Sequence, residues 1–92
     1  MSTRFAPEAV ADLEAAVEYL MECNPDAARS LVDRVFELTD RLEAGEFDGP
    51  EQRLSDGSVV RSWPLHPFRL YYQRDGEVLN VLRLYHLRRR PL

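Results

Sequence analysis

His86 and Arg69 are the side chains in the C-terminal half of this sequence that could most directly take part in chemistry. An unperturbed imidazole titrates close to neutral pH, so His86 could give or take a proton. A histidine at this position more often caps the end of a strand through a hydrogen bond. Arg69 offers a planar guanidinium that binds phosphate or carboxylate, or it could form an ion pair on the surface of a strand. Both interpretations stay open for each residue.

The sequence does not indicate a disulfide, a catalytic thiol or a metal site. Cys23 is the single cysteine, so the chain can form neither an internal disulfide nor a site with several thiolate ligands. We therefore expect no cofactor and no bound metal.

The charge of the chain is divided between its two halves. The net charge is −4 over 92 residues. Residues 1–56 hold 14 acidic residues and 5 arginines, which gives −9, whereas residues 57–92 hold 2 acidic residues and 7 arginines, which gives +5. The run Arg88-Arg89-Arg90 makes the end of the sequence basic. Such an end could approach DNA or an acidic protein surface, or it could be a solvated tail.

Length and composition indicate one small domain that spans residues 1–92. A chain of this length removes roughly 60–65% of its unfolded surface from water, so its core must be thin. No apolar run approaches the ~20 residues that a membrane span needs. The first residues carry Arg4 and several acids without the apolar region of a secretory signal. We expect a cytoplasmic protein that does not associate with a membrane.

Two amphipathic helices are predicted in the first half. Pro7 suits the first position of a helix over residues 7–22, whose apolar residues recur at spacings of three and four. Asn24 and Pro25 are typical of the start of a second helix, and Gly45 is typical of its end. Two antiparallel helices joined by a short turn form an α-helical hairpin, and each needs a further surface to bury its apolar stripe.

Strands supply that surface. Residues 2–6 can extend, residues 46–57 are polar and are predicted to form a loop, and three strands follow at 58–63, 68–74 and 77–86. The predicted fold is therefore α+β, in the order β-α-α-β-β-β, with the helical hairpin packed on one face of a small antiparallel sheet.

A two-residue loop at Asp75-Gly76 would fix the register of the last two strands. It pairs Tyr72 with Leu79 and Leu70 with Val81 on a helix-facing side, and it places Arg69 and His86 together on the open face. A β-bulge would exchange the two faces over part of one strand.

Several short runs, taken together, resemble the RelE/ParE superfamily of toxins from bacterial type II toxin–antitoxin systems. They cover nearly the whole chain: Phe5-x-Pro7-x-Ala9-x-x-Asp12-Leu13, Asn24-Pro25-x-Ala27-Ala28, Phe68-Arg69-Leu70-x-Tyr72, and Val81-Leu82-Arg83-Leu84-Tyr85-His86 with following arginines. The order and spacing of these runs, more than any one of them, carry the resemblance. The helical half looks particularly like the ParE branch.

The ParE branch implies a plasmid-stabilisation type of toxin that inhibits growth by poisoning DNA gyrase without being an enzyme. It also implies a cognate antitoxin, whose flexible C-terminal region wraps the toxin while its N-terminal domain binds operator DNA. The residues expected to bind the target are Arg83, His86, Arg88, Arg89 and Arg90. Those expected to bind the antitoxin are the apolar helix residues Val10, Leu13, Val17, Leu31 and Val35.

The RelE branch implies a different activity, which is ribosome-dependent cleavage of messenger RNA. Glu51, Arg69 and His86 match positions that some of those ribonucleases use. A carboxylate would take the 2′-hydroxyl proton, a guanidinium would stabilise the charged phosphorane, and an imidazole would protonate the leaving oxygen.

Two departures from the RelE pattern favour the ParE branch. Leu87 stands where those ribonucleases often have a further basic or aromatic side chain, and the overall acidic charge does not suit binding to ribosomal RNA. A third alternative is a degenerate member that binds its antitoxin and has no target. We therefore favour a gyrase poison that is not an enzyme.

Overall fold

The chain begins with a short strand and an α-helical hairpin. A computed structural model describes residues 2–88, starting with β1 (Ser2–Phe5), α1 (Pro7–Cys23) and α2 (Pro25–Glu43). Pro7 and Pro25 occupy the first turns of the two helices, and the side chain of Asn24 accepts a hydrogen bond from Ala27 N at 3.2 Å. The bounds lie within a residue or two of those predicted, because the signals that start and end these helices are local.

Four more strands complete a five-stranded sheet: β2 (Glu51–Arg53), β3 (Val59–Leu65), β4 (Phe68–Asp75) and β5 (Val78–His86). Their order is β1-β5-β4-β3-β2. β1 pairs with β5 in parallel, and the other pairs are antiparallel. The α+β fold and the order of the main elements are confirmed. The prediction of a loop over 46–57 was wrong in part, since β2 forms within it and adds an edge to the sheet.

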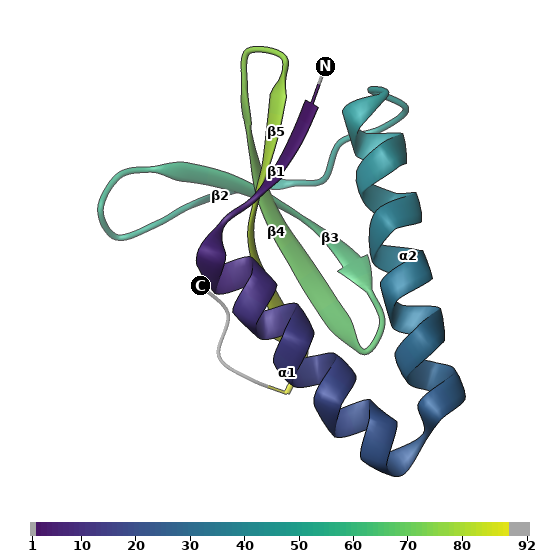
Figure 1. Cartoon of the computed structure of the whole chain (residues 1–92). Coiled ribbons are helices and arrows are strands. Elements are labelled where there is room, and N and C mark those ends of the chain that lie inside the picture. The colour runs from purple at the N-terminus through teal and green to yellow at the C-terminus, as the bar shows by residue number, and fades with distance from the viewer. Residues whose placement is uncertain (1, 89–92) are drawn as a thin grey trace.

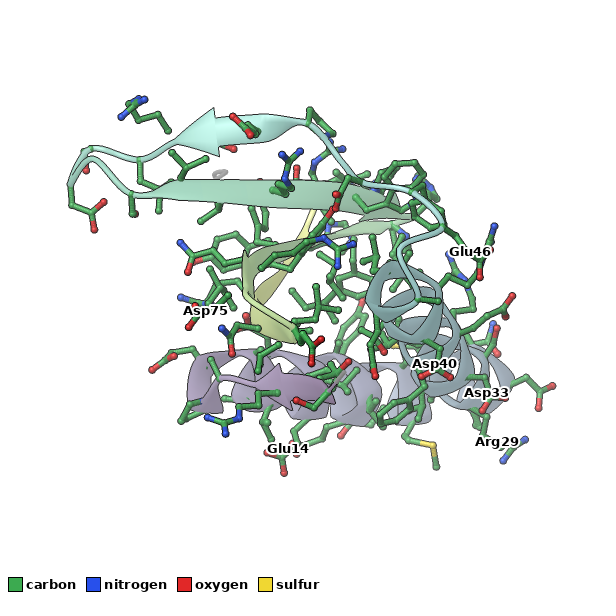
Figure 2. All side chains as sticks on the ribbon, turned by 90° about the horizontal axis from the view of Figure 1, so that it is seen from above. Glu14, Arg29, Asp33, Asp40, Glu46 and Asp75 are labelled. Carbon is green, nitrogen blue, oxygen red and sulfur yellow. The ribbon has the colours of Figure 1, made fainter. Side chains whose placement is uncertain are left out.

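The helical hairpin covers one face of the sheet, as Figure 1 shows. α1 packs against α2 and, among the strands, mainly against β5, while α2 also packs against β1 and β5. In Figure 2, the labelled Glu14 and Arg29 point away from the sheet, which leaves the apolar stripes of both helices facing inward. The core lies between the two layers and includes Leu31, Val35, Leu42, Leu70, Tyr72, Leu79 and Val81.

The register of β4 and β5 differs from the prediction. Asp75 pairs with Val78, so the loop is Gly76-Glu77 instead of Asp75-Gly76. Gly76 has a φ of 62°, which places the glycine at the first loop position, the position where a type II′ turn requires it. This two-residue shift keeps Leu79 and Val81 on the helix-facing side. They remain in the core, although their partners change.

A β-bulge in β5 has a larger effect. Tyr72 pairs with Val81 and Tyr71 pairs with Arg83, so Leu82 is an extra residue. The bulge exchanges the faces of the strand beyond it. Leu84 therefore enters the core, and His86 lies opposite Phe68 on the helix-facing side.

The segment after α2 is held by a group of hydrogen bonds that we call the Asp48 cluster, made of Asp48, Gly49, Tyr72 and Arg74. The buried Tyr72 hydroxyl donates to Asp48 Oδ1 at 2.9 Å and accepts from Gly49 N at 2.7 Å. Arg74 Nε also donates to Asp48 Oδ1, and its Nη2 donates to the carbonyl of Leu42 at 2.6 Å. The cluster ties the end of α2 to β4.

Among residues 2–88, no helix is long and apolar enough to cross a membrane.

Candidate functional site

A cleft opens between α1 and the end of β5, and we call it the C-terminal cleft. On the side of the strands its surface is apolar and comes from Phe68 and Leu84. On the side of α1, the small side chains of Ala15 and Ala16 leave room for the hollow. Tyr19 stands at its rim with 66% of its surface exposed. Its lining consists of Asp12, Ala15, Ala16, Tyr19, Phe68, Leu84, His86 and Arg88. Two of the predicted target-binding residues, His86 and Arg88, therefore lie together in a hollow of the surface.

His86 is fixed by two contacts. Its ring meets the ring of Phe68 edge to face, with the centroids 5.4 Å apart. Its Nδ1 accepts a hydrogen bond from the backbone N–H of Arg88 at 3.1 Å. In the neutral imidazole the proton therefore sits on Nε2. His86 therefore shapes the turn that follows β5, which agrees with the predicted capping hydrogen bond, while its role in target binding stays a prediction.

Asp12 joins the α1 wall of the C-terminal cleft to β5, in a group that we call the Asp12 cluster: Asp12, Arg83 and the backbone N–H of Leu84. Asp12 Oδ2 accepts from Arg83 Nε at 2.8 Å and from Leu84 N at 3.0 Å, while Oδ1 accepts from Arg83 Nη2 at 3.1 Å. The hydrogen bonds to Asp12 hold the pKa of Arg83 above its ordinary value. Arg83 was predicted to bind the target, but its charge is already matched within the chain.

Asp12 was not among the predicted site residues. A signal was present, because Asp12 stands three residues after Ala9 and four before Ala16, within the stripe of α1 that turns inward. A carboxylate at such a position needs a partner when it is buried.

Arg69 lies on the other face of the sheet. It pairs with Tyr85 across the strands, and its Nε donates to Ser62 Oγ at 2.8 Å. His86 faces the helices, so the prediction that Arg69 and His86 share the open face was wrong. The cause is the bulge in β5, which reverses the side on which His86 projects.

Glu51 lies at the opposite edge of the sheet. It sits on β2, not in a loop, and accepts a hydrogen bond from Arg61 Nη2 at 2.7 Å. β2 and β5 are three strand positions apart, which is roughly 14 Å at the usual spacing between strands. Proton transfer through a shared site needs heavy atoms about 3 Å apart. The structure does not bring Glu51, Arg69 and His86 together.

The predicted antitoxin-binding residues divide into two groups. Leu31 and Val35 are only 2% and 1% exposed, so they belong to the core and are not available to a partner. They face the sheet because α2 turns its apolar stripe toward it. Val10 is 41% exposed, and Leu13 and Val17 line a shallow groove with Val32 between the two helices. These three residues remain accessible.

The basic end is only partly described. Arg88 is exposed, whereas Arg89 and Arg90 lie outside the described residues. Within residues 2–88, no group of three or more His, Cys, Asp or Glu side chains is arranged to hold a metal ion.

Comparison with known proteins agrees with this architecture. A family model described as the ParE toxin of the type II toxin–antitoxin system parDE matches residues 3–91. A solved structure described as the chromosomal ParDE toxin–antitoxin system from P. aeruginosa is similar in fold, with a TM-score of 0.75 and 24% sequence identity over 94% of this chain and 95% of that chain. A search of curated proteins gives no match. Because the family model covers nearly the whole sequence, the chain belongs to the ParE family of type II toxin–antitoxin toxins.

Proposed function

We propose that this toxin inhibits growth by poisoning DNA gyrase, that it does so by binding through the C-terminal cleft, and that a cognate antitoxin of the ParD type neutralises it. The observation that carries the proposal is the placement of His86 and Arg88 at one rim of a cleft whose opposite rim is the exposed Tyr19. An aromatic side chain, an imidazole and an arginine around an apolar floor are typical of a surface that binds a macromolecule.

The alternative of ribosome-dependent RNA cleavage receives less support from the geometry. Its acid–base residues would have to converge on one phosphate, yet Glu51 is paired with Arg61 at a far edge and Arg69 projects from the opposite face to His86. Binding without chemistry needs no such convergence. The arrangement around the C-terminal cleft therefore favours a poison that acts by occupying its target.

The antitoxin is proposed to lie along α1. Val10 exposes apolar surface there, and the groove of Leu13 and Val17 is bordered by Glu14 and Glu18. A segment that combines apolar side chains with lysine or arginine would match both the groove and its charge. Such a segment would cover apolar surface that the toxin cannot bury by itself.

The test uses purified toxin and purified gyrase. We expect the wild-type chain to inhibit supercoiling and to cause cleaved DNA to accumulate, and we expect added antitoxin to reverse both effects. Arg88→Ala should raise the toxin concentration needed for half inhibition by about tenfold, which corresponds to about 1.4 kcal/mol of binding free energy.

Arg29→Ala is the matched control, because Arg29 is an exposed arginine of α2 whose side chain lies outside the cleft. It removes the same charge and should leave inhibition unchanged. Messenger RNA cleavage on ribosomes that is lost in His86→Ala, together with intact gyrase activity, would contradict the proposal and support the ribonuclease alternative.

A further inference from the structure

The C-terminal half of β5 has lost its neighbouring strand on one side. β1 pairs with β5 only from Val78 to Val81, and the last backbone bond along this edge runs from Ala6 N to the carbonyl of Val81 at 2.8 Å. The chain then leaves the sheet and enters α1. A strand edge without a neighbour has backbone groups that need other partners.

Asp12 supplies one such partner. Its Oδ2 accepts the N–H of Leu84, three residues beyond the last residue that β1 covers. A carboxylate of α1 thus takes the place of the backbone carbonyl that a longer β1 would offer. Only 11% of the Asp12 side chain is exposed, so this hydrogen bond is largely shielded from water.

Arg83 completes the link. Two of its nitrogens donate to the two oxygens of Asp12, a geometry that fixes both side chains in direction as well as in distance. Its guanidinium also lies over the ring of Tyr85, 4.4 Å from the centroid. Held by Asp12 on one side and by Tyr85 on the other, Arg83 acts within the chain and is poorly placed to pair with a second molecule.

The segment immediately after Arg83 lines the C-terminal cleft. Leu84, His86 and Arg88 are all within five residues of Arg83, and Asp12 lines the same cleft from α1. β4 pairs with this segment on its other side, as far as Phe68 and His86, and β1 does not reach it. The Asp12 cluster is therefore the hydrogen-bonded link that joins the segment directly to α1.

We propose that Asp12 is a positioning residue of the toxin: through Arg83 and Leu84 it holds the end of β5 against α1, in the arrangement in which His86 and Arg88 meet the target. The inference rests on the proposed function of the C-terminal cleft. It reassigns Arg83 from target binding to the support of that surface.

The experiment is a double-mutant cycle with Asp12→Asn, Arg83→Gln and the double variant, read as growth inhibition on expression and as gyrase inhibition in solution. We expect each single variant to lose about tenfold in potency. The double variant should be no weaker than either single one, because both substitutions break the same link.

Two outcomes would overturn the inference. If Arg83 itself contacts the target, Asp12→Asn frees its guanidinium and leaves potency unchanged or higher, while Arg83→Gln alone loses it. If Asp12 serves stability alone, Asp48→Asn will lower toxicity as much as Asp12→Asn does. Asp48 is the matched control, since it also binds an arginine and a second donor but does not line the cleft.

A measurement on the isolated full chain keeps the inference independent of the target. The amide of Leu84 should exchange its hydrogen faster in Asp12→Ala, which lacks both acceptor oxygens, than in the wild type, and equal exchange would overturn the positioning role. A wild-type chain that stops growth without affecting gyrase would sink the gyrase proposal, while the cycle measured by growth would still decide on Asp12. A chain that neither stops growth nor affects gyrase would overturn both.

Discussion

The Asp48 cluster and the Asp12 cluster use the same chemistry at two places in the sheet. In each, a carboxylate binds an arginine from a strand and accepts a second hydrogen bond, from the Tyr72 hydroxyl in one and from the Leu84 N–H in the other. The Asp48 cluster closes the segment between α2 and β2 over a fully buried tyrosine. The Asp12 cluster stands in the wall of an open cleft. The first cluster therefore closes a buried part of the fold, whereas the second faces the cleft that we propose as the binding surface.

The largest effect is expected where the Asp48 cluster meets the backbone of β3. A Cβ at Gly49 would overlap the carbonyl oxygen of Ser62, so Gly49→Ala must displace a strand or the segment after α2. We expect a loss of about 3 kcal/mol in the free energy of unfolding, at the upper end for an overpacked site. Chemical denaturation measures it.

Gly45→Ala provides the control for that prediction. Gly45 has a φ of 76° but open space around it, so alanine there should cost about 1–2 kcal/mol from backbone strain alone. Equal losses in the two variants would show that close packing at Gly49 adds nothing, and the stability role of this region would then need another origin.

The second prediction concerns acid. Burial tends to raise the pKa of Asp48, but the hydrogen bonds from Tyr72 and Arg74 outweigh it and hold the pKa below its ordinary value. A depressed pKa means that the carboxylate stabilises the fold above about pH 3.9, its unfolded value, and that this contribution is lost as pH falls through the folded pKa.

Asp48→Asn removes that contribution. The wild type and the variant should therefore differ in unfolding free energy at neutral pH by no more than about 1 kcal/mol, since Asp48 is partly exposed, and the difference should shrink below about pH 4. Thermal unfolding at a series of pH values tests this. A difference in unfolding free energy that grows as the pH falls would contradict a lowered pKa of Asp48.

The smallest effect on stability is expected at the rim of the C-terminal cleft. Tyr19→Ala should change the unfolding free energy by less than about 0.5 kcal/mol, because the side chain is mostly in water. It should nevertheless weaken toxicity. Met21→Ala is its control, an exposed apolar residue of the same helix outside the cleft. If both variants are equally toxic, Tyr19 is no part of the binding surface.

The helices and the core could be read from the sequence because their signals are local and periodic. Pro7, Asn24 and Gly45 mark helix ends, and residues such as Leu70 and Tyr72 alternate in a way that indicates a buried face. The core assignment tolerated an error in the hairpin register, since a shift of two residues keeps every side chain on its face.

The site was less predictable, because it depends on one extra residue and on a distant contact. The bulge at Leu82 places His86 on the side of the sheet that faces the helices. No residue type in β5 indicates that a bulge forms there. Asp12 and Arg83 are 71 positions apart, so their pairing appears only when the sheet is assembled. A polar residue within an apolar stripe was the available clue.

The parallel pairing of β1 with β5 sets the order in which parts of the fold can form during synthesis. Ser2 of β1 is synthesised 76 residues before Val78, the residue with which it pairs in β5. Contacts between residues far apart in the sequence form late in folding, because each of them must close a long loop. Leu84 and His86, on the strand side of the C-terminal cleft, belong to the same strand, β5, which is synthesised late. A chain that stops before Val78 therefore cannot pair β1 in this way, and it lacks Leu84, His86 and Arg88, which line the C-terminal cleft.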